Sequence, residues 1–315
     1  ETVPEIADTY FKHVFLEKPC CVDAPGYRLL LEANRLADQK GLKIGVGHQR
    51  RNTENYIESI RRVHDGIIGD IRSLKAHWLG SGIWRRTRAN LAEGLGRTPT
   101  EMEYQVYNWI NFAWLGGEQI CELLTHNLDV CNWLMKAHPA RAVGKCGREV
   151  AFQPEAGDIC DFFEVDYTYA DGTPLYAGCR WIPNRYALVG ECAEGTKGQW
   201  RPGEIADANR TTVFKSRSSS SSGSMNPFEE EHRKLVSAIR KGTPYNMLTD
   251  GATTSMTAIL GRMAAYEGRE VTWDEAIRSN ECWYPREFSF DATPPTLPDK
   301  LGSYRTPFRG RMLES

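Results

Sequence analysis

The start of the chain restricts its fold most, because it reads as a strand, a helix and a second strand in succession. "HVFLEKP" (13–19) is a short strand, and "LKIGVG" (42–47) is the continuous apolar run of a strand buried in a parallel sheet. Between them, Asp23 can cap a helix that has Pro25 in its first turn and ends at Gly41. Parallel strands need such a crossover helix. We therefore expect one α/β unit, the tail end of a doubly wound sheet that nothing upstream completes.

The rest of the chain changes to an α+β pattern. A helix is expected at 53–64 and a strand at 71–79. The run "DFFEVDYTYADGTPLYAGCRWI" (161–182) alternates like two strands of an antiparallel sheet, and Asp171-Gly172 marks the turn between them. The remaining helices are expected at 101–114, 116–133, 226–242, 250–268 and, as a short one, 273–279.

Two segments between the predicted elements lack a regular period. Residues 81–100 are rich in Gly, Arg and Trp and are expected to form a long surface loop, a kind of loop that is often functional. "FKSRSSSSSGSMNP" (214–227) is a low-complexity segment that needs no fixed structure. The pattern therefore predicts the end of a doubly wound domain at 1–50, an α+β domain with a mainly antiparallel sheet backed by helices at 51–288, and a surface tail at 289–315.

Composition excludes several classes of protein. The 315 residues are 25% charged and 41% hydrophobic, with a formal net charge of −2, which is typical of a globular protein with room for two domains. No basic block suggests binding to nucleic acid or to a membrane surface, and no apolar run is long enough to span a bilayer. The first residues lack the basic start and apolar core of a secretory leader, so we expect a cytoplasmic protein. Nine cysteines without a C-x-x-C pair indicate free thiols in a reducing compartment.

The helical stretch "GGEQICELLTHNLDVCNW" (116–133) combines apolar residues with a polar stripe, which consists of Glu122, His126 and Asp129. Residues three and four apart share one face of a helix, so these three side chains are expected to be neighbours. Charges in such surroundings are costly unless they are paired, hydrated or functional. An internal ion pair or a solvated face is one interpretation. The other is an acid–base dyad, in which Glu122 orients the imidazole of His126 and raises its basicity.

Lys18 directly follows the first predicted strand, at the carboxyl edge where α/β proteins hold their ligands. A lysine at this edge can polarise a hydroxyl or carbonyl group. Taken alone, however, a lysine is more often a surface cation.

Other chemistry has weaker support. The sequence contains neither G-x-G-x-x-G nor the P-loop motif, and after Gly45 and Gly47 the third glycine position is Arg50. A metal-dependent hydrolase or lyase remains an alternative, because two carboxylates and an imidazole on one helix face are metal-ligand types. The pairs of histidines typical of zinc hydrolases are missing, so we predict no metal site. Cys121 and Cys131 flank the polar stripe and are interpreted as small core residues.

Several segments together resemble the Gfo/Idh/MocA oxidoreductases, in the right order from about Lys12 to Ser279. They are "KHVFLEKP", "GVGHQRR", "GDIRSLKAHW", "GGEQICELLTHNLDVCNW", "NPFEEEHRKLVSAIRKG" and "TSMTAILGRMAAYEGREVTW". In that family the lysine of "EKP" and a D-x-x-x-H helix line the active site beside the nicotinamide. The resemblance implies that Lys18 and His126 are catalytic and that Glu122 takes the aspartate position, with a side chain longer by one methylene.

The resemblance also implies the other ligand contacts. Glu17, Lys18 and Pro19 would lie against the cofactor, which is NAD or NADP. Asp129 would support His126 or the substrate. Two further substrate contacts are expected from the residues themselves, Arg180 on a predicted strand and Trp84 in the aromatic loop.

The family carries a complete N-terminal Rossmann domain whose glycine-rich turn holds the cofactor diphosphate, and no such turn occurs in these 315 residues. Residues 1–50 therefore resemble the C-terminal remnant of that domain, and the chain resembles a fragment or a shortened relative. Because amide contacts to the diphosphate supply much of the affinity, we expect this chain alone to bind NAD(P) weakly or not at all.

The resulting hypothesis is an oxidoreductase that transfers hydride between NAD(P) and a sugar, polyol or related hydroxylated substrate. It is expected to act as a homo-oligomer that associates through its sheet domain. The alternative from another class is a non-catalytic binding or oligomerisation module derived from the same family.

Overall fold

The computed structural model describes residues 12–216 and 226–307. At one end lies a two-stranded parallel sheet, β1 (Val14–Leu16) and β2 (Ile44–Val46), connected by helix α2 (Ala24–Gln39). The carboxylate of Asp23 accepts a hydrogen bond from the amide of Gly26 at 2.8 Å, and Gly41 has a φ of +64°, so the predicted cap and terminator are confirmed.

The second sheet has nine strands in the order β10-β9-β8-β7-β3-β6-β5-β4-β11. Only β3 and β6 pair in parallel, and every other neighbouring pair is antiparallel. The strands are β3 (Ile71–Gly80), β4 (Pro139–Gly147), β5 (Phe162–Tyr169), β6 (Pro174–Trp181), β7 (Leu188–Gly195), β8 (Gly198–Arg201), β9 (Glu204–Asp207), β10 (Thr212–Lys215) and β11 (Val271–Thr272). The turn predicted at Asp171-Gly172 joins β5 to β6. A parallel α/β unit followed by a mainly antiparallel sheet confirms the predicted fold class.

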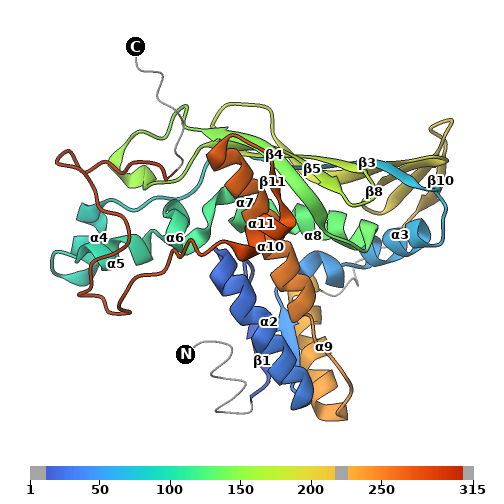
Figure 1. The fold of residues 1–315 in the computed structure, drawn as a ribbon, viewed down its shortest axis with the longest axis horizontal. Coiled ribbons are helices and arrows are strands. Elements are labelled where there is room, and N and C mark those ends of the chain that lie inside the picture. The colour runs from blue at the N-terminus through green and yellow to red at the C-terminus, as the bar shows by residue number, and fades with distance from the viewer. Residues whose placement is uncertain (1–11, 217–225, 308–315) are drawn as a thin grey trace.

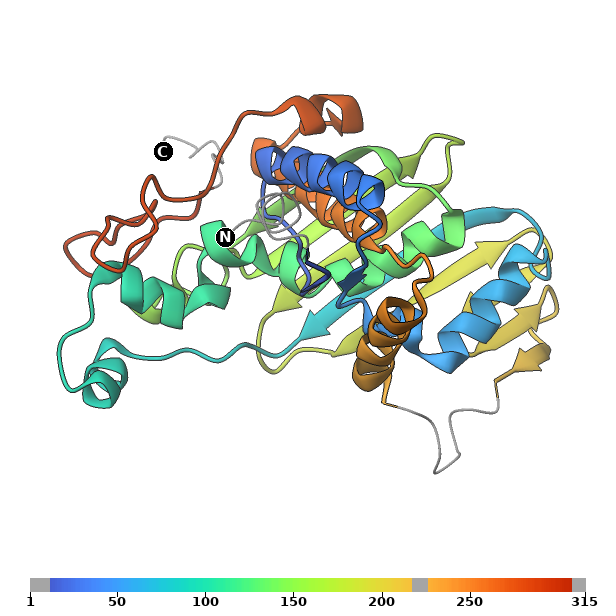
Figure 2. The ribbon, with the colours of Figure 1, turned by 90° about the horizontal axis from the view of Figure 1, so that it is seen from below.

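Helices cover one face of the large sheet (Figure 1, Figure 2). They include α3 (Glu54–His64), α8 (Thr125–Met135), α10 (Leu248–Glu267) and α11 (Trp273–Arg278). The main hydrophobic core lies between them and the sheet, with side chains such as Leu128, Tyr167, Trp200 and Ile259. The opposite face of the sheet carries exposed side chains such as Tyr176.

The small parallel sheet packs against the C-terminal half of the chain. The amide of Ile44 donates to the carbonyl of Tyr245 at 3.0 Å, and the amide of Met247 donates to the carbonyl of Ile44 at 2.9 Å. Helix α9 (Pro227–Lys241) packs against β2 and lies below the large sheet in the view of Figure 1. The carboxyl ends of β1 and β2 therefore face α8 and the start of α10.

Three predictions about local structure were wrong. Residues 116–133 are not one helix but two, α7 (Glu118–Glu122) and α8, with Leu123 and Leu124 between them. At this break the amide of Leu124 bonds to the carbonyl of Gln119, five residues back. Residues 81–100 are not entirely loop, because they contain α4 (Arg88–Leu95), capped by Thr87.

The stretch predicted as a helix at 101–114 is also divided. It forms α5 (Glu101–Tyr107), a 3₁₀ turn (Trp109–Asn111) and α6 (Ala113–Gly116). The segment after α11 runs beside α4 and α5 (Figure 2), and there Tyr304 is buried against Phe112 with ring centroids 4.9 Å apart. The predicted tail thus contributes a core residue to this part of the molecule.

The low-complexity segment 214–227 lies mostly outside the described residues, because 217–225 are not described. Within the two described ranges, no helix is both long enough and apolar enough to cross a membrane.

Candidate active site

The ends of β1 and β2 bring a dense group of charged and polar side chains against α7 and α8. Lys18, which follows β1, donates hydrogen bonds to the carbonyl of Glu122 at 2.5 Å and to its carboxylate at 2.6 Å. The two side chains are only 11% and 10% exposed. Burial raises the pKa of Glu122, and the ammonium of Lys18 acts in the opposite direction. Lys18 is thus a positioned group of the interior and not a surface cation.

His126 lies in the first turn of α8 and is 8% exposed. Its ring lies 5.9 Å from the ring of Trp78 on β3, and its Nδ1 atom has no hydrogen-bond partner among the described residues. Burial, assisted by the charges of Lys18 and Arg50, lowers the pKa of His126 to about 2. The imidazole is therefore neutral at physiological pH, and the ammonium of Lys18 lies close enough to act on it.

The proposed dyad of Glu122 with His126 is not what the structure contains. The carboxylate of Glu122 bonds to Lys18, and the break between α7 and α8 separates Glu122 from the helix that carries His126. Sequence spacing alone placed both side chains on one continuous helix face. The structure instead brings Lys18, Glu122 and His126 together with Lys18 as the partner of the acid.

Asp129 is fixed by two other elements. The Nε atom of Arg51 donates to both carboxylate oxygens, at 2.8 Å and 3.0 Å, and the hydroxyl of Thr254 on α10 donates at 3.0 Å. Burial alone would raise the pKa of Asp129, but the charge of Arg51 and these hydrogen bonds overcome it and lower the pKa to about 2. Asp129 is therefore an ionised carboxylate that connects α8 to the 3₁₀ turn after β2 (Gln49–Asn52) and to α10.

Three residues of the site were missed by the sequence reasoning, and all follow β2. His48 is buried, neither of its ring nitrogens has a hydrogen-bond partner among the described residues, and its Nδ1 lies 3.8 Å from a carboxylate oxygen of Asp129. Burial lowers the pKa of His48. Arg51 holds Asp129, and Arg50 contacts the carboxylate of Glu191 on β7. The segment "HQRR" follows a parallel strand, as Lys18 does, and that shared position is the signal that could have identified it.

Glu17 and Pro19, the other residues predicted to contact the cofactor, flank Lys18 at the end of β1. The peptide bond between Lys18 and Pro19 is cis. The carboxylate of Glu17 lies against Gly47 at the end of β2, so close that a side chain at position 47 would collide with it. These residues therefore line the carboxyl edge of the small sheet.

The structure does not bring Arg180 and Trp84 into this group. On β6, Cys179 faces the core, and its neighbour Arg180 faces the opposite side of the sheet, where it contacts the carbonyl of Tyr186. The side chain of Trp84 is 44% exposed, and its ring lies 6.2 Å from that of Trp109. Arg180 therefore lies on the face of the sheet opposite the helix that carries His126.

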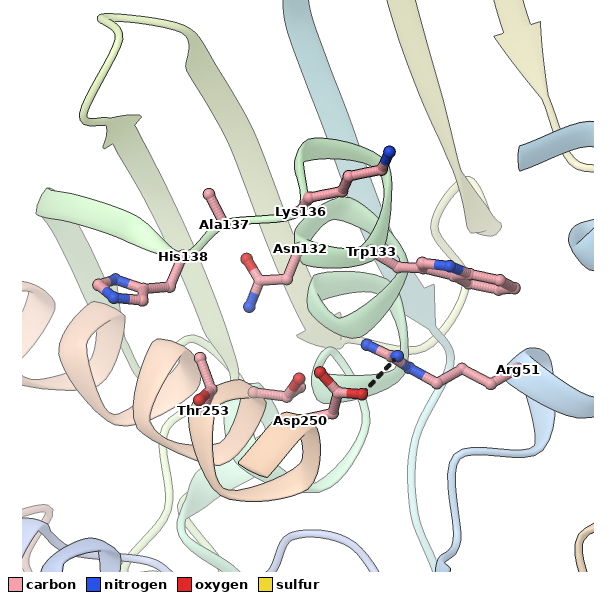
Figure 3. A pocket seen from close by; sticks show the side chains of 9 residues that line it. Arg51, Asn132, Trp133, Lys136, Ala137, His138, Asp250 and Thr253 are labelled. Carbon is pink, nitrogen blue, oxygen red and sulfur yellow. Dashed lines mark hydrogen bonds and ion pairs between the residues drawn. The ribbon is translucent and has the colours of Figure 1, made fainter. Parts of the chain in front are cut away.

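A separate pocket of about 380 Å³ opens at the end of α8 (Figure 3). Arg51 and Asp250, joined by a hydrogen bond of 2.9 Å, lie on one side of it, and His138 lies on the other. Its lining does not include Lys18 or His126. Among the described residues no group of three or more His, Cys, Asp or Glu side chains has the arrangement of a metal site.

The arrangement is suited to proton transfer at a hydroxyl or carbonyl group. It combines a neutral imidazole whose Nδ1 has no hydrogen-bond partner in the described part of the chain, an ammonium held by Glu122 and an ionised carboxylate one turn further along the helix. The carboxyl edge of a parallel sheet is where nucleotide cofactors bind in such folds.

Comparisons with known proteins show the fold. Neither a protein-family model nor a curated protein matches the chain. Among solved structures, levoglucosan dehydrogenase in complex with NADH and levoglucosan has a TM-score of 0.64 at 15% identity, covering 86% of this chain and 76% of that one. Aldose-aldose oxidoreductase from Caulobacter crescentus has a TM-score of 0.63 at 16% identity, covering 86% and 77%.

Scyllo-inositol dehydrogenase from Lactobacillus casei, with bound NAD(H) and scyllo-inositol, has a TM-score of 0.61 at 18% identity, covering 87% of this chain and 77% of that one. At these identities the likeness concerns the fold alone. The solved proteins named here are oxidoreductases, and the arrangement of their elements extends over most of the present chain.

Proposed function

Because the chain has the fold of the Gfo/Idh/MocA oxidoreductases, we propose that it is an NAD(P)-dependent dehydrogenase of a sugar, polyol or related hydroxylated substrate. The observation that carries this proposal is the position of Lys18 against the residues that precede the helix of His126. Lys18 and His126 come from segments more than one hundred residues apart, and Lys18 bonds to Glu122 directly before the helix of His126. The charge of Lys18 also contributes to the lowered pKa of His126.

The residues present fit the nicotinamide end of such a cofactor. Glu17, Lys18 and Pro19 lie at the carboxyl edge of the parallel strands, and both ring nitrogens of His48 and Nδ1 of His126 lack hydrogen bonds among the described residues. When bound, NAD(P) supplies the hydride acceptor. The 315-residue sequence has no glycine-rich diphosphate turn, so we expect weak binding. Micromolar affinity in a fluorescence titration with NADH would contradict that expectation.

The chain's own residues would remove the hydroxyl proton of the substrate. His126 is neutral in the free protein and can accept the hydroxyl proton of the substrate. Lys18 would donate a hydrogen bond to the same oxygen and stabilise the negative charge that develops there. Because Glu122 accepts two hydrogen bonds from Lys18, the ammonium is held in one orientation. Asp129 acts indirectly, by fixing α8.

The test is reduction of NAD⁺ by the purified chain at millimolar cofactor, with myo-inositol, scyllo-inositol and D-glucose as substrates. We expect at least one of them to be oxidised, and His126→Asn to lower kcat by about 10²- to 10⁴-fold, the usual contribution of a general base. His232→Asn, which removes an exposed histidine of α9, is the matched control. Equal rates for His126→Asn and the unchanged protein would refute the assignment, and the absence of oxidation would favour a non-catalytic module.

The open face of the nine-stranded sheet is where we expect subunits of a homo-oligomer to meet. Tyr176 and Val143 are 44% and 41% exposed there. Sedimentation of the purified chain, compared with a Tyr176→Glu variant, tests this part of the proposal.

A further inference from the structure

The pocket at the end of α8 has an unusual mixture of hydrogen-bonding groups. Arg51 donates through Nε to Asp129 and through Nη1 to Asp250, and no hydrogen bond engages its other terminal nitrogen, Nη2, among the described residues. The carboxylate of Asp250 is 52% exposed and uses only one oxygen in that contact. The pocket thus presents a fixed donor beside a fixed acceptor.

His138 adds a second acceptor on the other side. Its Nδ1 lies 3.1 Å from the carbonyl of Pro139 and must donate to it, because a carbonyl oxygen cannot donate. In the neutral ring Nε2 is then an acceptor. The ring is stacked on Trp273 with centroids 3.8 Å apart, which fixes its orientation. Figure 3 shows His138 facing Asp250 and Arg51 across the pocket.

The remaining lining narrows the class of ligand. Trp133 provides an apolar wall beside the guanidinium of Arg51. Lys136 also lines the pocket, but in Figure 3 its ammonium points away from Asp250 and His138. A small anion would therefore meet the carboxylate of Asp250 with only one cation in place, and that cation is already paired with two carboxylates.

Hydroxyl groups match this lining better, because each one donates and accepts. The volume of about 380 Å³ lies in the range of small-molecule pockets, about 300–1,000 Å³. We propose that this pocket is a second binding site, for a small polyhydroxylated molecule of the monosaccharide or cyclitol class. Arg51 lines this pocket and, through Asp129, connects it to the helix that carries His126.

The test uses myo-inositol as the probe and ligand-detected NMR, together with tryptophan fluorescence that Trp133→Phe assigns to the pocket. We expect Asp250→Asn to weaken binding by about tenfold or more, as the loss of a charged hydrogen-bond partner does. Asp274→Asn, an equal change of charge on an exposed residue of α11, should leave it unchanged. His138→Phe keeps a ring on Trp273 and removes Nε2, so it should also weaken binding.

The test of the second binding site does not depend on the dehydrogenase proposal. Binding at the pocket persists in His126→Asn even if no substrate is oxidised, whereas binding confined to the catalytic group is lost in that variant and is unaffected by Asp250→Asn. Loss of binding in His126→Asn together with unchanged binding in Asp250→Asn would overturn the proposal. So would the absence of any myo-inositol binding, or tighter binding of inorganic phosphate than of myo-inositol.

Discussion

The neutral, buried imidazole of His126 makes a quantitative prediction about acid stability. In the unfolded chain a histidine has a pKa of about 6.5, whereas burial and nearby cations lower that of His126 to about 2. Between these values the unfolded state binds the proton and the folded state does not, so stability falls as the pH falls. Integrated from pH 7 to pH 5, this single group removes about 2 kcal/mol from the free energy of unfolding.

Other groups titrate in the same pH range. The prediction is therefore tested by the difference in the free energy of unfolding between the unchanged protein and a variant. Burial raises the pKa of Glu118 to about 8 and that of Glu231 to about 7, and such acids stabilise the fold as the pH falls. Urea unfolding of the unchanged protein and of His126→Asn at pH 7 and pH 5 cancels these contributions. The loss between the two pH values should be about 2 kcal/mol smaller in the variant.

A second variant separates titration from simple destabilisation. Val130→Ala removes buried apolar atoms from the same helix without removing a titrating group. It should lower stability at both pH values and keep the full pH dependence. If His126→Asn and Val130→Ala show the same loss between pH 7 and pH 5, the imidazole is not held neutral by its surroundings, and the reasoning about the site fails with it.

Two further predictions concern the ion pairs of the site. Glu122→Gln should lower the free energy of unfolding by about 3–5 kcal/mol, because it leaves the ammonium of Lys18 buried without its counter-charge, and the double variant with Lys18→Met should recover part of the loss in a urea-unfolding cycle. Asp129→Asn should destabilise by a similar amount at pH 7. Its folded pKa of about 2 lies below the unfolded value, so this contribution is present above about pH 4 and is lost towards pH 2. The difference from the unchanged protein should therefore narrow in acid-unfolding curves, and a constant difference would exclude the pairing with Arg51.

Local signals made the elements at the start of the chain predictable. Asp23 and Gly41 mark the ends of α2 through contacts within a few residues, and the apolar run of β2 is typical of a parallel strand. The turn at Asp171-Gly172 likewise depends only on its own residues. Such features require no knowledge of the rest of the fold.

The wrong predictions concern positions whose structure depends on contacts between segments far apart in the sequence. The break after Glu122 places its carboxylate on Lys18, more than one hundred residues away, and no local signal announces it. The ion pair of Arg51 with Asp129 depends on how the residues after β2 pack against α8 and α10, which the sequence does not show. Arg180 was assigned to the site because it lies on a strand, but which face of the sheet it occupies depends on strand alternation and on what covers each side.

The polar stripe on 116–133 had two interpretations, a structural network of ion pairs and a catalytic group. The structure gives its acids a different role from its histidine. Glu122 is satisfied by Lys18, and Asp129 is satisfied by Arg51 and Thr254, so a structural network accounts for both acids.

A structural network of ion pairs does not account for the imidazoles of His48 and His126. Nδ1 of His126 and both ring nitrogens of His48 have no hydrogen-bond partner among the described residues, and a buried polar atom without a hydrogen bond costs about 1–3 kcal/mol. A purely structural arrangement would replace these rings with apolar side chains at no loss. The presence of these rings near the ammonium of Lys18 is better explained by a bound molecule that completes their hydrogen bonds.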